Sequence, residues 1–444
     1  MPDTIYALSS GAGAAGVAMV RVSGPASDEL LDALGIRELP APRYAALHNI
    51  MSPGMGSRVD QALVLRFPGP DSFTGEDVVE LHVHGGQAVL AALFEALEAS
   101  GLVRLAEPGE FTRRSFENGK LDLTAAEAIG DLVSAQTDAQ RIQALQQYDG
   151  GLAELYGRWR SELINLLGNA EAEIDFSDEE LPEALHEKVV QTINTIKQEV
   201  VKHSSSTLMG EQIRSGFPIS ILGAPNVGKS SLLNILARRD VVIVSEIAGT
   251  TRDVVEVQLD LGGYAVTISD TAGIRESNDA IEVEGVRRAE QRARDAALKL
   301  VVIAADEPVV PDRIRKLIDQ NTILVVNKID VLDRQPDLLG FPEAVQTRPV
   351  SAQTGEGIDT LLAGVTALVR ERLASREGVV PTRQRHRLAL EDAVTALDRA
   401  ASAALPELAA EDVRLAVRAL GRITGRVDID DVLDTVFRDF CIGK

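Results

Sequence analysis

The chain has 444 residues and a formal net charge of −22 at pH 7, with 45% hydrophobic and 25% charged residues, which suggests about three domains of ordinary globular composition. The single cysteine, Cys441, excludes an intrachain disulfide. The sequence shows no secretory signal, and no apolar run is near the roughly 18 residues that span a bilayer. We therefore expect a cytoplasmic protein without a membrane partner. Unless the acidity serves only solubility, it repels nucleic acid at long range, so we expect a basic partner to hold most of any RNA.

Four segments follow one another along the chain. Residues 1–119 hold short apolar runs such as GVAMVRVSG and DVVELHVH between Gly, Pro and Ser turns, and one helix from about Gln87 to Ala99, which predicts an α+β domain. Residues 120–212 and 375–444 have helical periodicity, while 213–374 alternate strands and helices as a parallel sheet requires. We therefore predict an α/β domain inserted into an all-α helical domain that both flanks build.

The α/β segment opens with a phosphate-binding loop. Gly223 to Ser230 match G-x-x-x-x-G-K-S between a predicted strand and a predicted helix. The glycines let the backbone approach phosphate oxygens, and the amides at the helix start point toward them. Lys229 is expected to reach the β- and γ-phosphates, and the Ser230 hydroxyl to bind Mg²⁺.

Two further motifs follow this loop and are expected to sense the γ-phosphate. The run YAVTISDTAG ends a second strand with Asp270, whose carboxylate can hold the Mg²⁺ shell through water, and Gly273 can offer its amide to the γ-phosphate. Between the loop and this strand, GTTRD contains Thr250 and Thr251. We predict that Thr251 completes the magnesium site.

The last two motifs predict the choice of base. In TILVVNKID, Asp330 can accept hydrogen bonds from N1–H and N2–H₂ of guanine, a pair of donors that adenine does not offer. Asn327 and Lys328 are expected to support this loop and cover the base. The run RPVSAQTG places Ser351, Ala352 and Gln353 against the guanine O6. Because all four motifs occur in the right order, the segment is predicted to be a Ras-like P-loop domain that binds GTP.

One element of small Ras-like switches is missing. Ile274 stands where those proteins carry a glutamine that orients the attacking water. Either hydrolysis is negligible, or another group orients water and another charge neutralises the transition state. Arg252 and Arg275 are candidates for that charge, although a solvated or salt-bridged loop arginine is the more ordinary interpretation.

Runs outside this domain carry a more specific resemblance. DSFTGEDVVELHVHGG, PGEFTRRSFENGKLDLTAAEA, EAEIDF and the terminal FCIGK are similar to motifs of the bacterial tRNA-modification GTPases called MnmE or TrmE, and the whole chain resembles that family. Ala125 departs from the polar residue common in the family at that position.

The resemblance implies a way to replace the missing glutamine. G domains of the family pair across their switch loops and use K⁺ where other systems insert an arginine. The matching ligands here are the Asn226 side chain, oxygens of Ser245 and Thr250, and the Ile247 carbonyl; for Asn226, a turn-forming role is the alternative. Glu282 matches the acidic residue that orients water. The full set expected to contact GTP is Asn226, Val227, Gly228, Lys229, Ser230, Ser231, Ser245, Glu246, Ile247, Ala248, Gly249, Thr250, Thr251, Asp270, Thr271, Ala272, Gly273, Asn327, Lys328, Asp330, Ser351, Ala352 and Gln353.

The resemblance also implies a folate site in the N-terminal domain, which mediates homodimerisation in the family. The residues matching contacts to a 5-formyltetrahydrofolate-type ligand are Arg21, Glu80, Lys120 and Lys444. Cys441 is either a residue needed for tRNA modification or a buried thiol that acts as a small hydrophobe.

Two histidines near this site could be taken for a metal pair. His82 and His84 share one strand face, but no third ligand stands at a recognisable spacing, which favours a structural role.

The family further implies a heterotetramer with the FAD-dependent flavoprotein MnmG, which would hold most of the tRNA. Together they would install a carboxymethylaminomethyl or aminomethyl group at C5 of the wobble uridine. Two alternatives stay open: a ribosome-assembly GTPase without modification chemistry, and a folate-dependent one-carbon enzyme that does not need its G domain.

Overall fold

The computed structural model describes the chain apart from residues 1–2, 12, 176–182, 239–255, 271–289, 333–345, 375–377, 428–432, 434–435, 439 and 444, and apart from the side chains of 169–175, 183–188 and 270. The chain forms two compact units. The first contains Met1–Gly130, Gln147–Leu181 and Ala403–Lys444, and the second contains Asp131–Gln146 and Pro182–Ser402.

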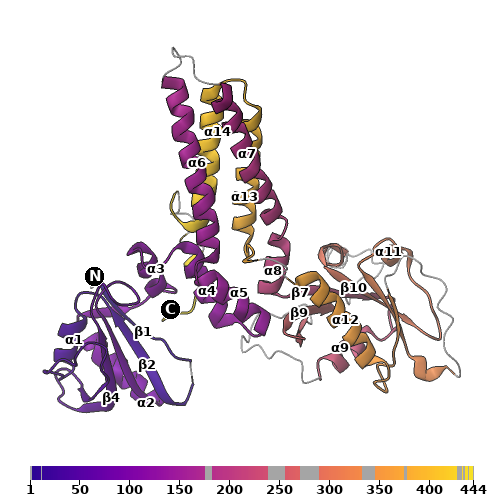
Figure 1. The fold of residues 1–444 in the computed structure, drawn as a ribbon. Helices are drawn as coiled ribbons and strands as arrows, with labels where there is room; N and C mark the ends of the chain where they lie inside the picture. The colour runs from indigo at the N-terminus through magenta and orange to yellow at the C-terminus, as the bar shows by residue number, and fades with distance from the viewer. Residues whose placement is uncertain are drawn as a thin grey trace, which may run out of the picture. The chain divides into compact units, whose positions relative to one another are not determined.

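A six-stranded sheet forms the N-terminal part of the first unit (Figure 1). Its order is β3-β4-β5-β2-β1-β6, with β6 parallel to β1 and the other neighbours antiparallel. The strands are β1 Thr4–Leu8, β2 Ala15–Ser23, β3 Ala46–Met51, β4 Arg58–Phe67, β5 Val78–Gly85 and β6 Val103–Leu105. Helices α1 (Ser27–Ala33) and α2 (Gln87–Ala99) pack on one face, and α2 confirms the helix predicted there. The period-2 burial of β5, where Leu81 and Val83 point inward, leaves polar side chains on the other face.

Helices complete the first unit. α3 (Glu110–Glu117) and α4 (Leu123–Ser134) follow the sheet, and the division between the units falls inside α4, after Gly130. Two long helices, α6 (Gly151–Asp175) and α14 (Pro406–Thr424), pack lengthwise against each other (Figure 1). Their shared core is apolar because each presents residues at helical spacing, including the buried Trp159.

The second unit contains the α/β domain and the remaining helices. Its sheet has the order β12-β11-β10-β7-β9-β8, all parallel except β8 against β9. The strands are β7 Phe217–Gly223, β8 Glu256–Leu261, β9 Tyr264–Asp270, β10 Leu298–Ala304, β11 Thr322–Asn327 and β12 Gln346–Pro349. The helices are α5 Asp138–Tyr148, α7 Glu183–Ser204, α8 Thr207–Ser215, α9 Lys229–Leu236, α11 Asp312–Arg315, the 3₁₀ turn η1 Ile329–Val331, α12 Ile358–Leu373 and α13 Gln384–Ser402.

The architecture confirms the predicted fold class. Every residue of β10 and β11 is buried, as expected for central parallel strands that are covered on both faces. The order of the sheet and the loop between β7 and α9 are those of a Ras-like P-loop domain. Within the described residues, no helix is both long and apolar enough to cross a bilayer. The domain limits placed at 119, 212 and 374 stay a prediction.

Candidate functional site

The phosphate-binding loop joins β7 to α9 at the carboxyl edge of the parallel sheet. A β-carbon on Gly228, which has φ +95°, would lie 2.1 Å from Asn327 Nδ2, so this position accepts only glycine. Asn226 has φ +64°, a left-handed conformation that asparagine tolerates. The Lys229 ammonium donates to the carbonyls of Gly223 at 3.0 Å and Ala224 at 2.9 Å, which holds its charge over the loop. Ser230 and Ser231 follow in the first turn of α9.

A buried asparagine connects this loop to the two base-recognition motifs. Asn327, 2% exposed at the end of β11, donates from Nδ2 to the Val227 carbonyl at 2.8 Å. Its Oδ1 accepts the Ala352 amide at 2.9 Å. One side chain therefore fixes the phosphate loop and the S-A-Q loop relative to each other, and both of its polar ends are satisfied.

The predicted guanine-reading carboxylate lies beside this connection. Asp330, in the exposed turn η1 after Lys328 (φ +64°), accepts the Ser351 hydroxyl at 2.5 Å. The Ser351 oxygen in turn accepts the amide of Gln353 at 3.2 Å. The carboxylate is thus oriented by a hydroxyl that the S-A-Q loop itself holds in place, and it stays open to solvent for a ligand.

Many predicted contacts lie outside the described residues. For Asp270 only the backbone is described; it ends β9 opposite Ile221 of β7 and so lies next to the phosphate loop. The residues that lie wholly outside are Ser245, Glu246, Ile247, Ala248, Gly249, Thr250, Thr251, Thr271, Ala272, Gly273, Glu282 and Lys444, together with Arg252, Ile274 and Arg275.

A cavity lies in the N-terminal domain, with a volume of about 460 Å³, a size typical of small-molecule sites. It brings together three of the predicted folate residues, Arg21, Glu80 and Lys120. Arg21 and Glu80 are register partners on β2 and β5, and their side chains form an ion pair at 2.9 Å. The Lys120 ammonium donates to the Pro70 carbonyl at 2.8 Å.

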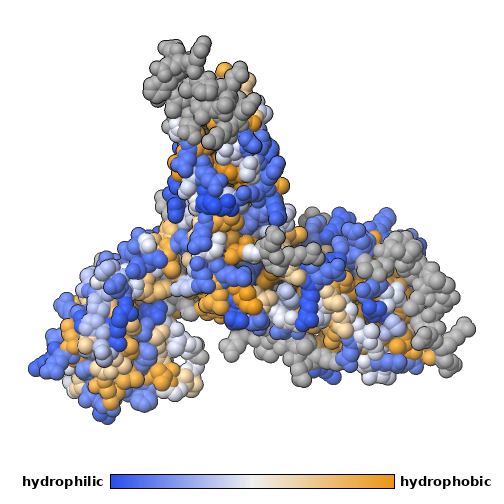
Figure 2. Space-filling view, in the orientation of Figure 1, coloured by the Kyte–Doolittle hydropathy of each residue, from blue (hydrophilic) through white to orange (hydrophobic). Residues whose placement is uncertain are grey.

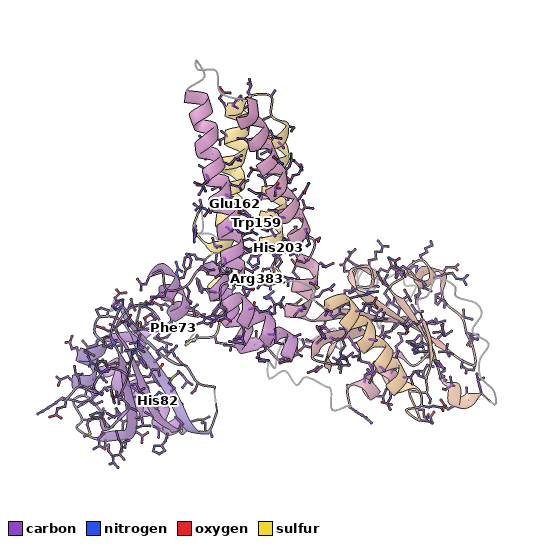
Figure 3. The ribbon with its side chains drawn as sticks, in the orientation of Figure 1. Phe73, His82, Trp159, Glu162, His203 and Arg383 are labelled. Carbon is purple, nitrogen blue, oxygen red and sulfur yellow. The ribbon has the colours of Figure 1, made fainter. Side chains whose placement is uncertain are left out.

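The sequence prediction missed other residues that line this cavity. They are Arg43, Phe67, Asp71, Ser72, Phe73 and Val78. Phe73 lies 5.5 Å from the Arg21 guanidinium, within cation–π range, and is labelled in Figure 3. Asp71, Ser72 and Phe73 belong to the run DSFTGEDVVELHVHGG, so that run was a usable signal. An aromatic wall with charges of both signs suits a planar polar ring that carries an acidic tail.

The two histidines of β5 bind separate carboxylates. His82 Nε2 lies 3.3 Å from Glu80 and His84 Nδ1 lies 2.9 Å from Asp60. Burial raises the pKa of Asp60, but the backbone amides of His84 and Gln61 and then the His84 ring outweigh this effect and hold that pKa below its usual value. Among the described residues, no group of three possible ligands could hold a metal ion.

The C-terminal tail is anchored on the N-terminal domain. The Ser9 hydroxyl donates to the Gly443 carbonyl at 2.8 Å, and Ile442 forms an isolated bridge with Pro108. A β-carbon on Gly443, at φ +101°, would lie 2.1 Å from the Leu8 carbonyl oxygen, so the tail needs glycine here. The Cys441 thiol is exposed, so the alternative of a buried thiol is wrong. The tail backbone thus contacts the N-terminal domain, while the Cys441 side chain faces solvent.

The chain is similar to known proteins over nearly its whole length. The family model described as GTP-binding protein TrmE N-terminus matches residues 4–120, and the one described as MnmE helical domain matches residues 123–441. The tRNA modification GTPase MnmE of Paramagnetospirillum magneticum is 51% identical over 448 residues, with 100% of both chains covered. The proteins of the same name from Parvibaculum lavamentivorans and Caulobacter vibrioides are 50% and 48% identical, also with 100% of both chains covered.

Proposed function

Because the chain belongs to the family of the tRNA modification GTPase MnmE, we propose that it hydrolyses GTP to drive modification of the wobble uridine of tRNA. Its partner in this reaction is the FAD-dependent protein MnmG, with which it forms a heterotetramer. The product carries a carboxymethylaminomethyl or aminomethyl group at C5 of that uridine. The acidic chain, at −22, leaves most of the grip on tRNA to the partner.

The observation that carries the GTP assignment is the double hydrogen bond of Asn327. It joins the phosphate loop, at Val227, to the loop beside the base-reading Asp330, at Ala352. A nucleotide laid across this edge places its phosphates at the start of α9 and its base against Asp330. Asp330 accepts N1–H and N2–H₂ of guanine, whereas adenine would leave the carboxylate unpaired.

Two cations are proposed at the phosphate loop and the segment 245–251 that follows it. Mg²⁺ would be held by Ser230 and Thr251, with Asp270 supporting its water shell, and would neutralise phosphate charge. K⁺ would be held by the Asn226 side chain and oxygens of Ser245, Ile247 and Thr250, and would supply the positive charge that an arginine gives elsewhere. Glu282 would position the attacking water, since Ile274 has no hydrogen-bonding group.

The cavity of the N-terminal domain is proposed to bind a 5-formyltetrahydrofolate-type cofactor, which supplies a one-carbon unit. Glu80, held in place by its ion pair with Arg21, would accept the amide and amine donors of the pterin. Lys120 and the tail residue Lys444 would attract the glutamate carboxylates. The exposed Cys441 stands on the same tail.

The N-terminal domain is also proposed to form the homodimer. Leu47 and Leu63 are register partners on β3 and β4 and are 59% and 45% exposed. Figure 2 shows several apolar residues on the visible face of this domain. Apolar pairs of this kind gain free energy when a second copy covers them.

The test is nucleoside mass spectrometry of tRNA from a strain that lacks the gene, complemented with the wild type, Lys229→Ala or Lys120→Ala. We expect the wobble modification only with the wild type. Intact modification in the deletion strain would reject the function, and an accompanying defect in ribosomal subunits would favour the ribosome-assembly alternative. Modification restored by Lys229→Ala would identify a folate enzyme that does not need its G domain.

A further inference from the structure

Arginines on either side of the inserted α/β domain in the sequence share one carboxylate. Arg214, in the last turn of α8, precedes β7, and Arg383 immediately precedes α13. Asp131, in the last turn of α4, accepts Arg214 Nε at 3.0 Å and Arg383 Nη2 at 2.9 Å on the same oxygen. Its side chain is 15% exposed, and Arg383 is labelled in Figure 3. A single acidic group thus ties the start of the α/β segment and the residue before α13 to α4.

The segment after Asp131 contacts the α/β domain a second time. The Ala139 amide, in the first turn of α5, donates to the Gly263 carbonyl at 2.9 Å. Gly263 lies at the turn between β8 and β9. In the sequence, β8 follows the GTTRD segment and β9 leads into DTAG, so both segments expected to follow the γ-phosphate feed this hairpin.

A third contact links the start of α5 to Arg214, one of the two arginines that bind Asp131. Gln140 donates from Nε2 to the Arg214 carbonyl at 2.9 Å, so the start of α5 holds the backbone of the same arginine whose side chain binds Asp131. These bonds explain why residues 131–146 belong to the compact unit of the α/β domain, whereas the first part of α4 belongs to the other unit.

The helix that carries Asp131 also leads to the folate cavity. α4 begins at Leu123, just after the cavity residue Lys120. A helix transmits displacement along its axis because its backbone hydrogen bonds resist stretching. A shift of the α/β domain that pulls on Asp131 therefore acts on the element next to Lys120.

We propose that Asp131 is a positioning residue that couples the nucleotide state of the α/β domain, through α4, to ligand affinity at the cavity of Arg21, Glu80 and Lys120. The inference rests on the proposed function, since it requires both a GTP site and a folate site. By linkage, the coupling acts equally in both directions on binding affinity.

The test measures the Kd of 5-formyltetrahydrofolate for the full-length protein in potassium buffer, with GDP and with GDP plus aluminium fluoride. For the wild type we expect the two values to differ by about fivefold or more, the usual lower range of allosteric coupling. Asp131→Asn removes the charge at nearly constant shape, and its ratio should fall to within about twofold of one. Basal GTP hydrolysis at low protein concentration should stay unchanged.

The matched control is Asp138→Asn, which lies in the same segment and loses only an exposed ion pair with Arg141. It should keep the wild-type ratio. If Asp131→Asn unfolds, Arg214→Gln and Arg383→Gln each remove one bond and should each lower the ratio partially.

Three results would overturn the inference. An unchanged ratio in folded Asp131→Asn, or in both arginine variants, would show that the coupling takes another route. A wild type that binds both ligands with a ratio of one would reject the coupling and leave both binding sites standing. A wild type that binds neither ligand would overturn the proposed function itself.

Discussion

In the proposed GTP site, a single side chain is expected to decide which base is accepted. Asp330 is exposed, yet the Ser351 hydroxyl at 2.5 Å fixes its orientation, and Ser351 is itself fully buried. A carboxylate offers only acceptors, so it selects a base edge that offers only donors. We therefore expect base selectivity to depend on the charge state and identity of this one residue.

Asp330→Asn should reverse that selectivity. The amide presents a donor to guanine N2–H₂, so we expect GTP affinity to fall on the order of 10³-fold, while xanthosine triphosphate, which has an acceptor at that position, gains affinity. Nucleotide affinities from fluorescence titration would check both effects, and the gain also shows that the variant is folded. Equal GTP affinity in variant and wild type would remove Asp330 from base recognition.

At the scale of elements, loops from different strands are joined by buried polar groups. Asn327, at the end of β11, satisfies one backbone carbonyl and one backbone amide of two other loops. The loops after β7 and β12 therefore depend on β11 for their positions.

Asn327→Ala should weaken both folding and nucleotide binding. Each backbone group left unpaired in the interior costs about 1–3 kcal/mol, so we expect a lower thermal midpoint and a weaker GTP affinity. Asn327→Asp is the graded control, because it keeps an acceptor for the Ala352 amide and loses the donor to Val227. Differential scanning calorimetry and GTP titration give the two readings, and an unaltered GTP affinity in Asn327→Ala would contradict the bridging role.

Helices α7 and α13 meet around a pair of histidines. Burial, and then the charge of His386, lower the pKa of His203 from 6.5 to about 4, and His386 is 0% exposed (His203 is labelled in Figure 3). The folded protein thus resists protonation of His203 at a pH where the unfolded chain already accepts the proton.

Stability should therefore fall with pH between about 6.5 and 4. Above pH 6.5 His203 is neutral in both the folded and the unfolded state, so its protonation does not reduce stability. As the pH falls, the unfolded state takes up the proton first, which lowers the free energy of unfolding. The loss is at most about 3 kcal/mol, because solvent reaches part of the ring. Urea unfolding at pH 7.5 and pH 5 checks this, and His203→Gln should show a smaller difference between the two. The same difference in both proteins would assign the effect to other groups.

At the scale of the whole molecule, the two proposed ligand sites belong to different compact units. The phosphate loop and Asp330 lie in the second unit, while Arg21, Glu80 and Lys120 lie in the first. Neither unit contains both sites, so a GTPase that drives folate-dependent chemistry needs communication along the chain or between copies.

The proposed pairing of G domains around K⁺ gives a prediction at this scale. Replacing K⁺ with Na⁺ should slow GTP hydrolysis on the order of 10³-fold, since the proposed mechanism puts the ion in the place of an arginine finger, and should weaken G-domain pairing. Single-turnover hydrolysis and analytical ultracentrifugation with GDP and aluminium fluoride give the readings. Equal rates in the two salts would rule out the cation mechanism.

Glu282→Ala should slow GTP turnover at nearly constant nucleotide affinity, because the variant loses the carboxylate proposed to position the attacking water.

The sequence by itself determined the features whose requirements are local. The phosphate loop was predictable because glycines, Lys229 and Ser230 stand next to one another, and helix Gln87–Ala99 because its apolar spacing lies within one element. The family motifs also pointed to Arg21, Glu80 and Lys120, which the structure places in one cavity.

Only the tertiary structure decided what depends on distant partners. Arg43 and Phe73 join the cavity wall only because distant segments of the chain meet there. The same holds for the two hydrogen bonds of Asn327. The exposure of the Cys441 thiol also depends on how the tail packs on the fold. Asp131 is the clearest case, because nothing near it in the sequence indicates that Arg214 and Arg383 would share its carboxylate. Local propensity sets the elements, whereas burial and charge pairing across the fold set which of their side chains meet.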